Sequence, residues 1–295
     1  VEIVSGLPFN EYVQENIAKY DLVIASEVFQ MATLLIADIC KGKLVIWQEL
    51  SLHNKMMFKL PSKIWYNCVV SCTSLKNALV VARSENAKQF IKQYCRNVSD
   101  EIVEHGANGE LLKPKEHAGR NFSIVGQLIA RKNINAIIEK FAKFVKKDAY
   151  SDFVLNIIGE GKERENLEKL VGDLSIQENV KFRGFLTHNE MVVYLADSYA
   201  LLVDTLQDLN MVSIPESIVS GTPVLMNTVP NTASFVSQNR LGIAKDGWNE
   251  QELIAMVDNY DEFHRNCIAI RESITNVGCS RKMIDIFINT KTDTE

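Results

Sequence analysis

Short apolar runs alternate with amphipathic stretches along the first part of the chain. The runs Asp21–Ala25, Lys43–Trp47 and Ala78–Ala82 are rich in Val, Ile and Leu, as is typical of strands buried on both faces of a parallel sheet. The stretches Phe29–Cys40 and Ser84–Tyr94 predict helices that cover such a sheet. Shorter elements are expected as strands at Glu2–Val4 and Glu101–Glu104 and as a helix at Tyr12–Tyr20. The pattern predicts an α/β domain.

The alternation restarts at Asn121, after the tract Asn108–Gly119, whose glycine, proline and charge are typical of a linker. We therefore expect two domains, 1–119 and 120–270, followed by helical residues 271–295 that pack back towards the first domain. In the second domain, strands are expected at 122–125, 153–158, 180–182, 199–203 and 224–226, and helices at 133–146, 163–174, 188–196 (opened by the capping box Thr187–Glu190), 249–259 and 261–289.

The composition limits the classes of protein to which this chain can belong. With 295 residues, 46% hydrophobic and 23% charged, the chain is long enough for two globular cores. A net charge of −5 gives no general affinity for nucleic acid. No apolar run approaches the roughly 20 residues that span a bilayer, and the first residues show no basic and apolar leader. The six cysteines and five histidines show no metal-ligand spacing. These features favour a reduced, cytoplasmic protein without a bound metal.

The most informative stretch is Leu201–Met226. It predicts a buried strand, a polar loop over Asp204–Asn210, a helix that starts near Ser213 and a second strand. Unpaired N–H groups at the start of a helix favour an anion such as phosphate. The carboxylates of Asp208 and Glu216 flank the loop and would repel phosphate, so hydroxyl groups are their natural partners. The ligand suggested is a phosphate that carries polyols, such as a nucleotide sugar. Alternatively, Glu216 only completes a capping box with Ser213.

This stretch resembles the donor-site signature of retaining GT-B glycosyltransferases of family 4. The matching pattern is Asp208, seven intervening residues, Glu216 and then Gly-Thr-Pro. The resemblance implies that Asp208 contacts the transferred sugar and that Glu216 holds the ribose hydroxyls. It also places Asn210, Met211 and Val212 in the donor loop. Two departures are visible: Asp replaces the usual Glu at 208, and Leu-Asn-Met replaces the Gly-Phe-Gly that lets the backbone approach a pyrophosphate.

A second motif runs from Gly126 to Lys132, where a strand ends and a helix begins. A lysine before a helix can neutralise a diphosphate as a point charge, although an exposed helix-terminal lysine is the plainer reading. The segment resembles the family's Gly-Arg-Leu…Glu-Lys-Gly, which implies that Lys132 grips the donor diphosphate. Gln127 occupies the place of the family's arginine, and Arg131 lies out of register.

Two more segments follow the family's order. Ile157–Glu163 resembles its Ile-Val-Gly-Asp/Glu-Gly-Pro turn, so Gly159 is expected in the wall of the nucleotide cleft, or else in an ordinary tight turn. Backbone groups of Gly184, Phe185 and Leu186 are implied to border the base. Four motifs in order identify the chain as a GT-B candidate over residues 121–260.

The first domain matches the family only in outline. Gln48 and Glu49 stand where the family often has His-Asp, and His53 is a candidate substitute, so all three are expected on the acceptor side. The family's initial strand and Gly-Gly loop have no counterpart before Val1, which predicts a truncated first domain. The tract 54–65 mixes Lys55, Lys59 and Lys63 with apolar side chains, a pattern that favours either peripheral membrane contact or core packing, with Pro61 expected to interrupt a helix.

The expected fold is therefore α/β GT-B, with two Rossmann-like domains facing a cleft. The expected activity is metal-independent transfer of a sugar, with retention, from a nucleotide-diphosphate sugar to a glycan or lipid-linked saccharide. No cofactor beyond the donor is implied. The expected location is the cytoplasm, with or without peripheral contact at the inner face of a membrane. The alternatives are a weakly catalytic GT-B homologue that acts as a partner subunit, and a related activity such as sugar-nucleotide epimerisation.

Overall fold

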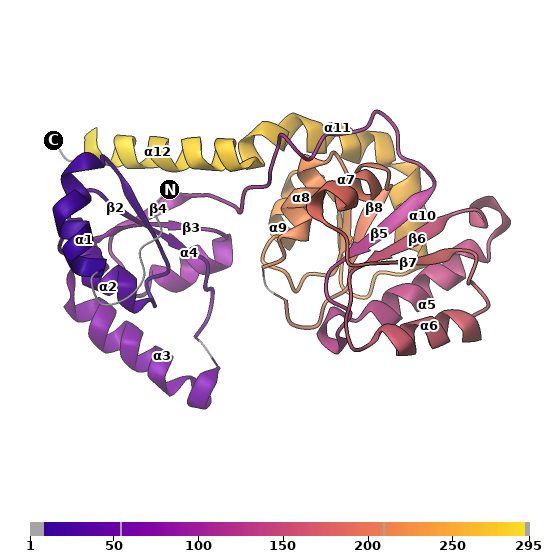
Figure 1. Cartoon of the computed structure of the whole chain (residues 1–295), viewed down its shortest axis with the longest axis horizontal. Coiled ribbons are helices and arrows are strands. Elements are labelled where there is room, and N and C mark those ends of the chain that lie inside the picture. Colours follow the sequence, from indigo (N-terminus) through magenta and orange to yellow (C-terminus); the bar gives the residue numbers. More distant parts are fainter. Residues whose placement is uncertain (1–8, 54, 209, 293–295) are drawn as a thin grey trace. The chain divides into compact units, whose positions relative to one another are not determined.

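The computed structural model describes residues 9–53, 55–208 and 210–292, which form two compact α/β units (Figure 1). Unit 1 comprises residues 1–104 and 279–295, and unit 2 comprises residues 105–278. The strand expected at Glu2–Val4 lies outside the described residues. Within the described ranges, no helix is both long and apolar enough to cross a bilayer.

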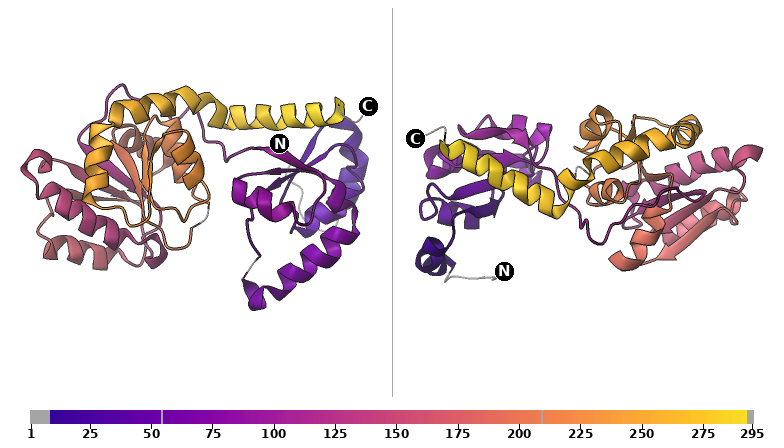
Figure 2. Two further views of the ribbon diagram at one scale, coloured as in Figure 1. Left: turned by 180° about the vertical axis from the view of Figure 1, so that it is seen from behind. Right: turned by 90° about the horizontal axis from the view of Figure 1, so that it is seen from above.

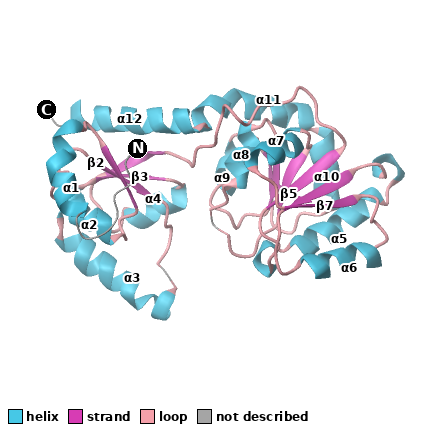
Figure 3. Ribbon diagram, viewed as in Figure 1, coloured by secondary structure: helices cyan, strands magenta, loops and turns pink. Residues whose placement is uncertain are grey.

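Unit 1 is built on a parallel sheet of order β1-β2-β3-β4, formed by Val23–Ser26, Leu44–Gln48, Leu79–Ala82 and Val98–Ile102. Alternate residues of β2 point to opposite faces: Ile46 belongs to one core with Tyr66 and Phe90, and Val45 to another with Phe287. The first core is covered by α1 (Phe9–Asn16), α2 (Met31–Ala37), α4 (Glu85–Ile91) and the helical segment Trp65–Val70, which continues α3 (Leu60–Ile64); Figure 3 shows these helices.

The second face of this sheet is covered by the end of the chain. The helix α12 (Asn276–Thr292) places Met283, Ile286 and Phe287 against Val45 and other residues of β2 and β3. The view from above in Figure 2 shows α12 running along this unit. Residues almost 240 positions apart in the sequence therefore share one core.

Unit 2 contains a parallel sheet of order β10-β9-β8-β5-β6-β7. Its strands are β5 (Asn121–Val125), β6 (Val154–Ile158), β7 (Val180–Gly184), β8 (Ala200–Val203), β9 (Val224–Met226) and β10 (Gly242–Ala244). Its helices are α5 (Ile134–Val145), α6 (Arg164–Asp173), α7 (His188–Ala196), α8 (Ser213–Val219), α9 (Ala233–Gln238), α10 (Glu250–Asp258) and α11 (Tyr260–Ile270). Separate apolar clusters fill the two faces, one around Phe122 and Phe141 and one around Leu201 and Ile218.

Most elements lie where the hydrophobic pattern predicts them, and two differences are instructive. The pattern missed α9 and β10, which are short. Pro61 does not interrupt a helix: it lies in the first turn of α3, where its missing N–H costs nothing. The residues before it, Met57, Phe58 and Lys59, form a turn with positive φ angles.

Candidate functional site

The strand order around β5 defines where unit 2 would bind a ligand. β5 lies between β6 and β8, so the chain leaves β5 towards one side of the sheet and later returns on the other. Parallel α/β sheets bind ligands beyond the carboxyl ends of their strands at such a switch point. The segments that follow β5 and β8 are Gly126–Lys132 and Asp204–Asn210. The first and second sequence motifs therefore meet at the expected position.

An ion-pair cluster joins these two segments. Lys132 Nζ lies 2.5 Å from Asp208 Oδ2, as an ion pair rather than an aligned hydrogen bond, and the Arg131 guanidinium donates to Asp208 Oδ1. The Asp208 side chain is buried, that of Lys132 is partly buried, and that of Arg131 is half exposed. One carboxylate faces two cations, so the cluster carries one net positive charge and remains attractive to an anion.

Backbone contacts hold the same segments together. Arg131 O accepts hydrogen bonds from Leu206 N at 2.8 Å and from Thr205 Oγ1 at 3.0 Å. Thr205 Oγ1 in turn accepts the N–H of Asp208 at 3.2 Å. The position of Asp208 relative to the β5 loop is thus fixed by several bonds, not by the ion pairs alone.

Glycines bring the backbone close at this edge. A Cβ placed on Gly159 would lie 2.0 Å from Gly126 O, and the Gly159 φ of +136° is also unfavourable for other residues. A Cβ on Gly126 would lie 3.4 Å from Lys132 Cε, because the lysine side chain crosses over this glycine. The two loops therefore pack backbone to backbone, with Lys132 above them.

Glu216 lies in the first turn of α8 and is buried. Its Oε1 lies 3.3 Å from Nε2 of His188, the largely exposed first residue of α7. Burial raises the pKa of Glu216, and His188 partly offsets that shift. The capping box with Ser213 is not formed, since α8 has no side-chain cap. His188 was not predicted from the sequence, where it is only the second residue of a correctly predicted capping box, Thr187–Glu190.

The remaining donor-side candidates differ in exposure. Gln127 and Phe185 are exposed, Val212 is exposed at the start of α8, and Met211 is buried in the core. Leu186 is half buried against that core. Arg131, not Gln127, supplies the second cation beside Lys132.

Backbone and amide contacts position two further candidates. Gly184 O accepts the N–H of Gly159 at 2.8 Å, which joins the segment expected to border the base to the turn at Ile157–Glu163. Asn210 Oδ1 accepts from Asn231 Nδ2 at 3.1 Å. Leu209 lies outside the described residues.

The acceptor-side candidates lie in unit 1. Gln48 is fully buried: its Oε1 accepts the N–H of Val28 at 3.2 Å and its Nε2 donates to Leu50 O at 3.0 Å. Both ring nitrogens of His53 are hydrogen-bonded inside the unit, to Ser62 and Tyr94. Glu49 alone of the three has a substantially exposed side chain, and it pairs with Arg83.

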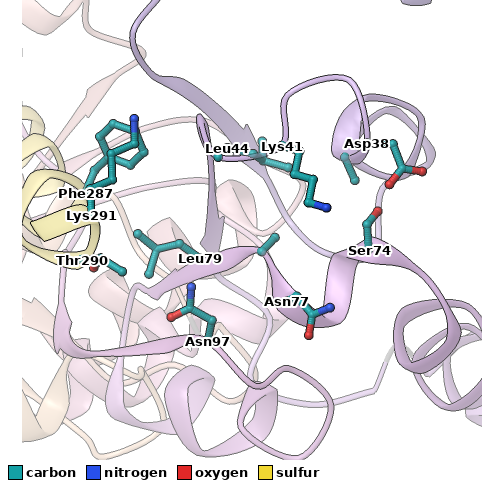
Figure 4. Close-up of a pocket in the computed structure, with 13 residues that line it drawn as sticks. Asp38, Lys41, Leu44, Ser74, Asn77, Leu79, Asn97, Phe287, Thr290 and Lys291 are labelled. Atoms are coloured by element: carbon teal, nitrogen blue, oxygen red, sulfur yellow. The ribbon is translucent and has the colours of Figure 1, made fainter. Parts of the chain in front are cut away.

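Figure 4 shows a cavity of about 270 Å³ in unit 1. It lies at the amino ends of β2 and β3, where Leu44 and Leu79 line it together with Lys41, Asn77 and Thr290. Because ligand sites of parallel sheets lie at the opposite, carboxyl ends, this cavity is not the predicted site. Within the described ranges, His, Cys, Asp and Glu side chains form no cluster that could hold a metal ion.

Known proteins share this architecture over nearly the whole chain. The structure of Anabaena HepE in complex with UDP superposes with a TM-score of 0.71 and 17% identity, covering 96% of this chain and 82% of the other. The lipopolysaccharide outer core galactosyltransferase WaaB superposes with a TM-score of 0.65 and 16% identity, covering 96% and 78%. Two parallel-sheet α/β units of this kind define the GT-B fold.

The sequence gives the family. Residues 117–260 match the model of the glycosyl transferases group 1, and the second unit of this chain belongs to that family. The O-antigen chain mannosyltransferase RfbU of Salmonella typhimurium is 24% identical over 207 residues, which cover 68% of this chain and 57% of that protein. An uncharacterized glycosyltransferase of Haemophilus influenzae is 29% identical over 157 residues, covering 52% and 43%. The chain thus spans about half the length of these relatives.

Proposed function

We propose that this chain transfers a sugar from a nucleotide-diphosphate sugar to a saccharide or lipid-linked acceptor, with retention of the anomeric configuration and without a metal ion. The observation that carries the proposal is the Lys132–Asp208 pair at the switch point of unit 2. The relatives support it, since their names include a mannosyltransferase and an alpha-monoglucosyldiacylglycerol synthase of Streptococcus pneumoniae. Solved neighbours contain UDP or UDP-glucose.

The residues divide the chemical work between them. In the transfer, the bond between the anomeric carbon and the phosphate oxygen breaks, and the diphosphate leaves with the bonding electrons. The acceptor oxygen bonds to the anomeric carbon on the same face and gives its proton to the leaving diphosphate. Lys132, with Arg131 beside it, stabilises the charge that develops on the diphosphate, which is where electrostatic catalysis contributes most. Two positive side chains supply the neutralisation that a metal ion would otherwise give.

The carboxyl groups hold the neutral parts of the donor. Glu216, whose carboxyl group faces an exposed histidine and not its own helix, binds the ribose hydroxyls. Asp208 exchanges its contact with Lys132 for one with the transferred sugar when the diphosphate arrives. The donor thus replaces an internal anion at the two cations.

The decisive experiment is calorimetric titration with UDP and GDP, followed by a transfer assay with the matching nucleotide sugars. We expect Lys132→Ala to weaken diphosphate binding by about 100-fold, because a charged hydrogen bond contributes about 1.5–3 kcal/mol. Lys143→Ala, an exposed lysine on α5, is the matched control and leaves binding unchanged. Unchanged affinity in Lys132→Ala would contradict the donor site.

The transfer assay decides the rest. NMR of the product reports the anomeric configuration, and activity in EDTA reports metal independence. Binding without turnover, in the presence of a panel of saccharide acceptors, would instead favour the partner-subunit reading. An epimerised sugar nucleotide formed without an acceptor would establish the third alternative.

Peripheral membrane contact is part of the proposal. Met57 and Phe58, 70% and 99% exposed, lie on the positive-φ turn before α3, close in sequence to Lys59 and Lys63. An exposed aromatic flanked by lysines favours an anionic interface. We expect the protein to sediment with phosphatidylglycerol vesicles and not with phosphatidylcholine vesicles, and Phe58→Asp to abolish that binding. Equal binding of Phe58→Asp and wild type would remove this segment from the proposal.

A further inference from the structure

The carboxyl edge of the first sheet carries a charged residue after each of three neighbouring strands. Glu27 follows β1, Glu49 follows β2 and Arg83 follows β3. The register pairs Gln48 with Ala82, so Glu49 and Arg83 follow at the same level of the sheet. Because neighbouring strands lie about 4.8 Å apart, the backbones of Glu27 and Arg83 are roughly 10 Å apart. This edge is the one at which parallel sheets bind ligands.

Arg83 has donors that the protein does not use. Its side chain is only 5% exposed, and its Nη1 lies 2.7 Å from Glu49 Oε1. Its Nε and Nη2 are buried and, among the described residues, have no hydrogen-bond partner. Buried charged donors without acceptors are rare and costly, so each needs an explanation. Nε and Nη2 form the edge of a guanidinium that binds two oxygens of a carboxylate or phosphate side by side.

Glu27 offers a complementary group. Its Oε1 accepts the N–H groups of Glu49 at 2.6 Å and Leu50 at 3.0 Å, whereas its Oε2 is buried and accepts no hydrogen bond from the part of the chain that the structure describes. Burial, with a smaller contribution from the charge of Glu49, raises the pKa of Glu27 to about 7. Near neutral pH this oxygen therefore exists both as a donor and as an acceptor, which suits a hydroxyl group.

The backbone at Glu27 is also unusual. Its φ of +63° lies in the left-handed region, which is uncommon for residues other than glycine, asparagine and aspartate. Such conformations persist where the surrounding structure holds them, and they cluster at functional sites. Here the two N–H groups bound to Oε1 hold the side chain over the start of the segment after β2.

Glu49 occupies the position beside Arg83 that an oxyanion would take. Its side chain is 44% exposed and is the partner that holds Arg83. An incoming oxyanion can replace this carboxylate at Nη1 and also reach the unused nitrogens, whereas Glu49 satisfies only one of the three.

We propose that Glu27, Glu49 and Arg83 form a binding site for a hydroxylated molecule that carries an oxyanion, either a carboxylate or a phosphate. Arg83 binds the oxyanion, Glu27 binds a hydroxyl group, and Glu49 is displaced on binding. The inference rests on the proposed function in one respect, that the molecule bound here is the acceptor. It then names the acceptor class: an anionic sugar or a phosphate-linked polyol, and not a neutral glycan.

The test uses matched probes on the full chain. Methyl glucuronide and methyl glucoside differ in a carboxylate, and glycerol 1-phosphate and glycerol differ in a phosphate. Titration followed by NMR is expected to show that each anionic probe binds at least about tenfold more tightly than its neutral partner. Arg83→Lys, which keeps the charge but loses the paired donors, removes that preference. Equal affinities of the neutral and anionic probes for the wild-type protein would overturn the proposal.

Two further variants keep the test decisive. Glu49→Gln removes the competing charge, so it should tighten binding of the anionic probes. If Arg83→Lys does not fold, unchanged affinity in Glu49→Gln overturns the site. Lys92→Ala, which removes an exposed lysine paired with Asp100 in the same unit, is the control for loss of a positive charge. An equal loss of binding in this control would show a non-specific charge effect and would also overturn the site.

The outcome is separable from that of the donor site. If UDP and GDP fail to bind while the anionic probes bind through Arg83, the proposed transferase function falls and the oxyanion site stands. If the nucleotides bind through Lys132 and no probe prefers the anion, the oxyanion site falls alone.

Discussion

The carboxyl edges of the two sheets place charge in opposite ways. In unit 2, one acid, Asp208, satisfies two bases that come from the loop after β5. In unit 1, the base Arg83 is held by one oxygen of Glu49; two of its nitrogens and one oxygen of Glu27 have no hydrogen-bond partner in the described ranges. Both edges belong to parallel sheets with the same relation of strand to loop.

If both edges bind charged ligands, as we propose, they are prepared for them in two different ways. In the proposed donor site of unit 2, the carboxylate of Asp208 offsets one of the two positive charges until the ligand replaces it. Unit 1 leaves part of its hydrogen-bonding capacity unused, so its empty site stores an unfavourable free energy that a ligand releases. The first solution favours stability of the free protein, and the second favours affinity.

The largest expected effect tests the internal anion. Asp208→Asn keeps the side-chain size but removes the charge that faces Lys132 and Arg131. We expect transfer to fall by about 10²–10³-fold, as for loss of one preorganised polar contact, while UDP or GDP binds more tightly. Calorimetry and the transfer assay measure the two effects. Asp173→Asn, an exposed position on α6, should change neither; weaker nucleotide binding in Asp208→Asn would contradict the exchange.

The close approach of backbones in unit 2 gives the next effect. Gly159→Ala places a Cβ 2.0 Å from Gly126 O at a positive φ, so we expect a loss of about 3 kcal/mol or more in the free energy of unfolding of unit 2. Gly247→Ala is the control for backbone strain without a clash, since nothing lies within 4 Å of its Cβ, and it should cost only about 1 kcal/mol. Urea unfolding compares the two, and equal losses would refute the packing argument.

Glu27 makes the stability of unit 1 depend on pH. Its pKa is about 7 in the folded state against an ordinary value of 4.5, so ionisation favours the unfolded state. The penalty is absent below pH 4.5, grows as the pH rises towards 7 and is complete above it. Glu27→Gln should therefore stabilise unit 1 by up to about 3 kcal/mol at pH 8 and by much less at pH 5. Urea unfolding at the two pH values measures the difference, and Glu15→Gln, at an exposed position on α1, is the control substitution.

The smallest expected effects on stability concern the residues that cap the helices beside the two sheet edges. Ser84, directly after Arg83, accepts the N–H of Ala87 at 3.2 Å and caps α4. Thr187, directly before His188, shares a capping box with Glu190 at the start of α7. Ser84→Ala and Thr187→Ala should each cost about 1 kcal/mol in thermal or urea unfolding. A larger effect on anionic-probe binding for Ser84→Ala than for Thr187→Ala would sharpen the assignment of the first edge.

The sequence predicts the strands and helices because each of them depends on the local pattern of apolar and polar residues. Runs such as Lys43–Trp47 need burial on both faces, and only a covered parallel sheet provides it. The elements that were missed, α9 and β10, are too short for a period to show. The spacing of Asp208 and Glu216 also predicts a site, since both lie on one loop and the helix that follows it.

Contacts between distant residues were not predictable in the same way. Nothing in the sequence pairs Asp208 with Arg131, 77 positions away, or Glu216 with His188. Glu27 and Arg83 were not predicted as site residues, because a single charged residue after a strand is common. The usable signal was their repetition: a charged residue directly follows each of three successive strands, β1, β2 and β3.

The helix α12 has a consequence for the order in which the protein matures on the ribosome. Unit 2 is one uninterrupted stretch of chain, so it can fold as soon as residue 278 has emerged. Residues 9–104 of unit 1 are translated before unit 2, yet one face of their sheet stays uncovered until Met283, Ile286 and Phe287 have been synthesised. The earlier half of the protein is therefore the later one to be completed, and a premature stop codon shortly before residue 283 would expose its apolar sheet to aggregation while leaving the other half intact.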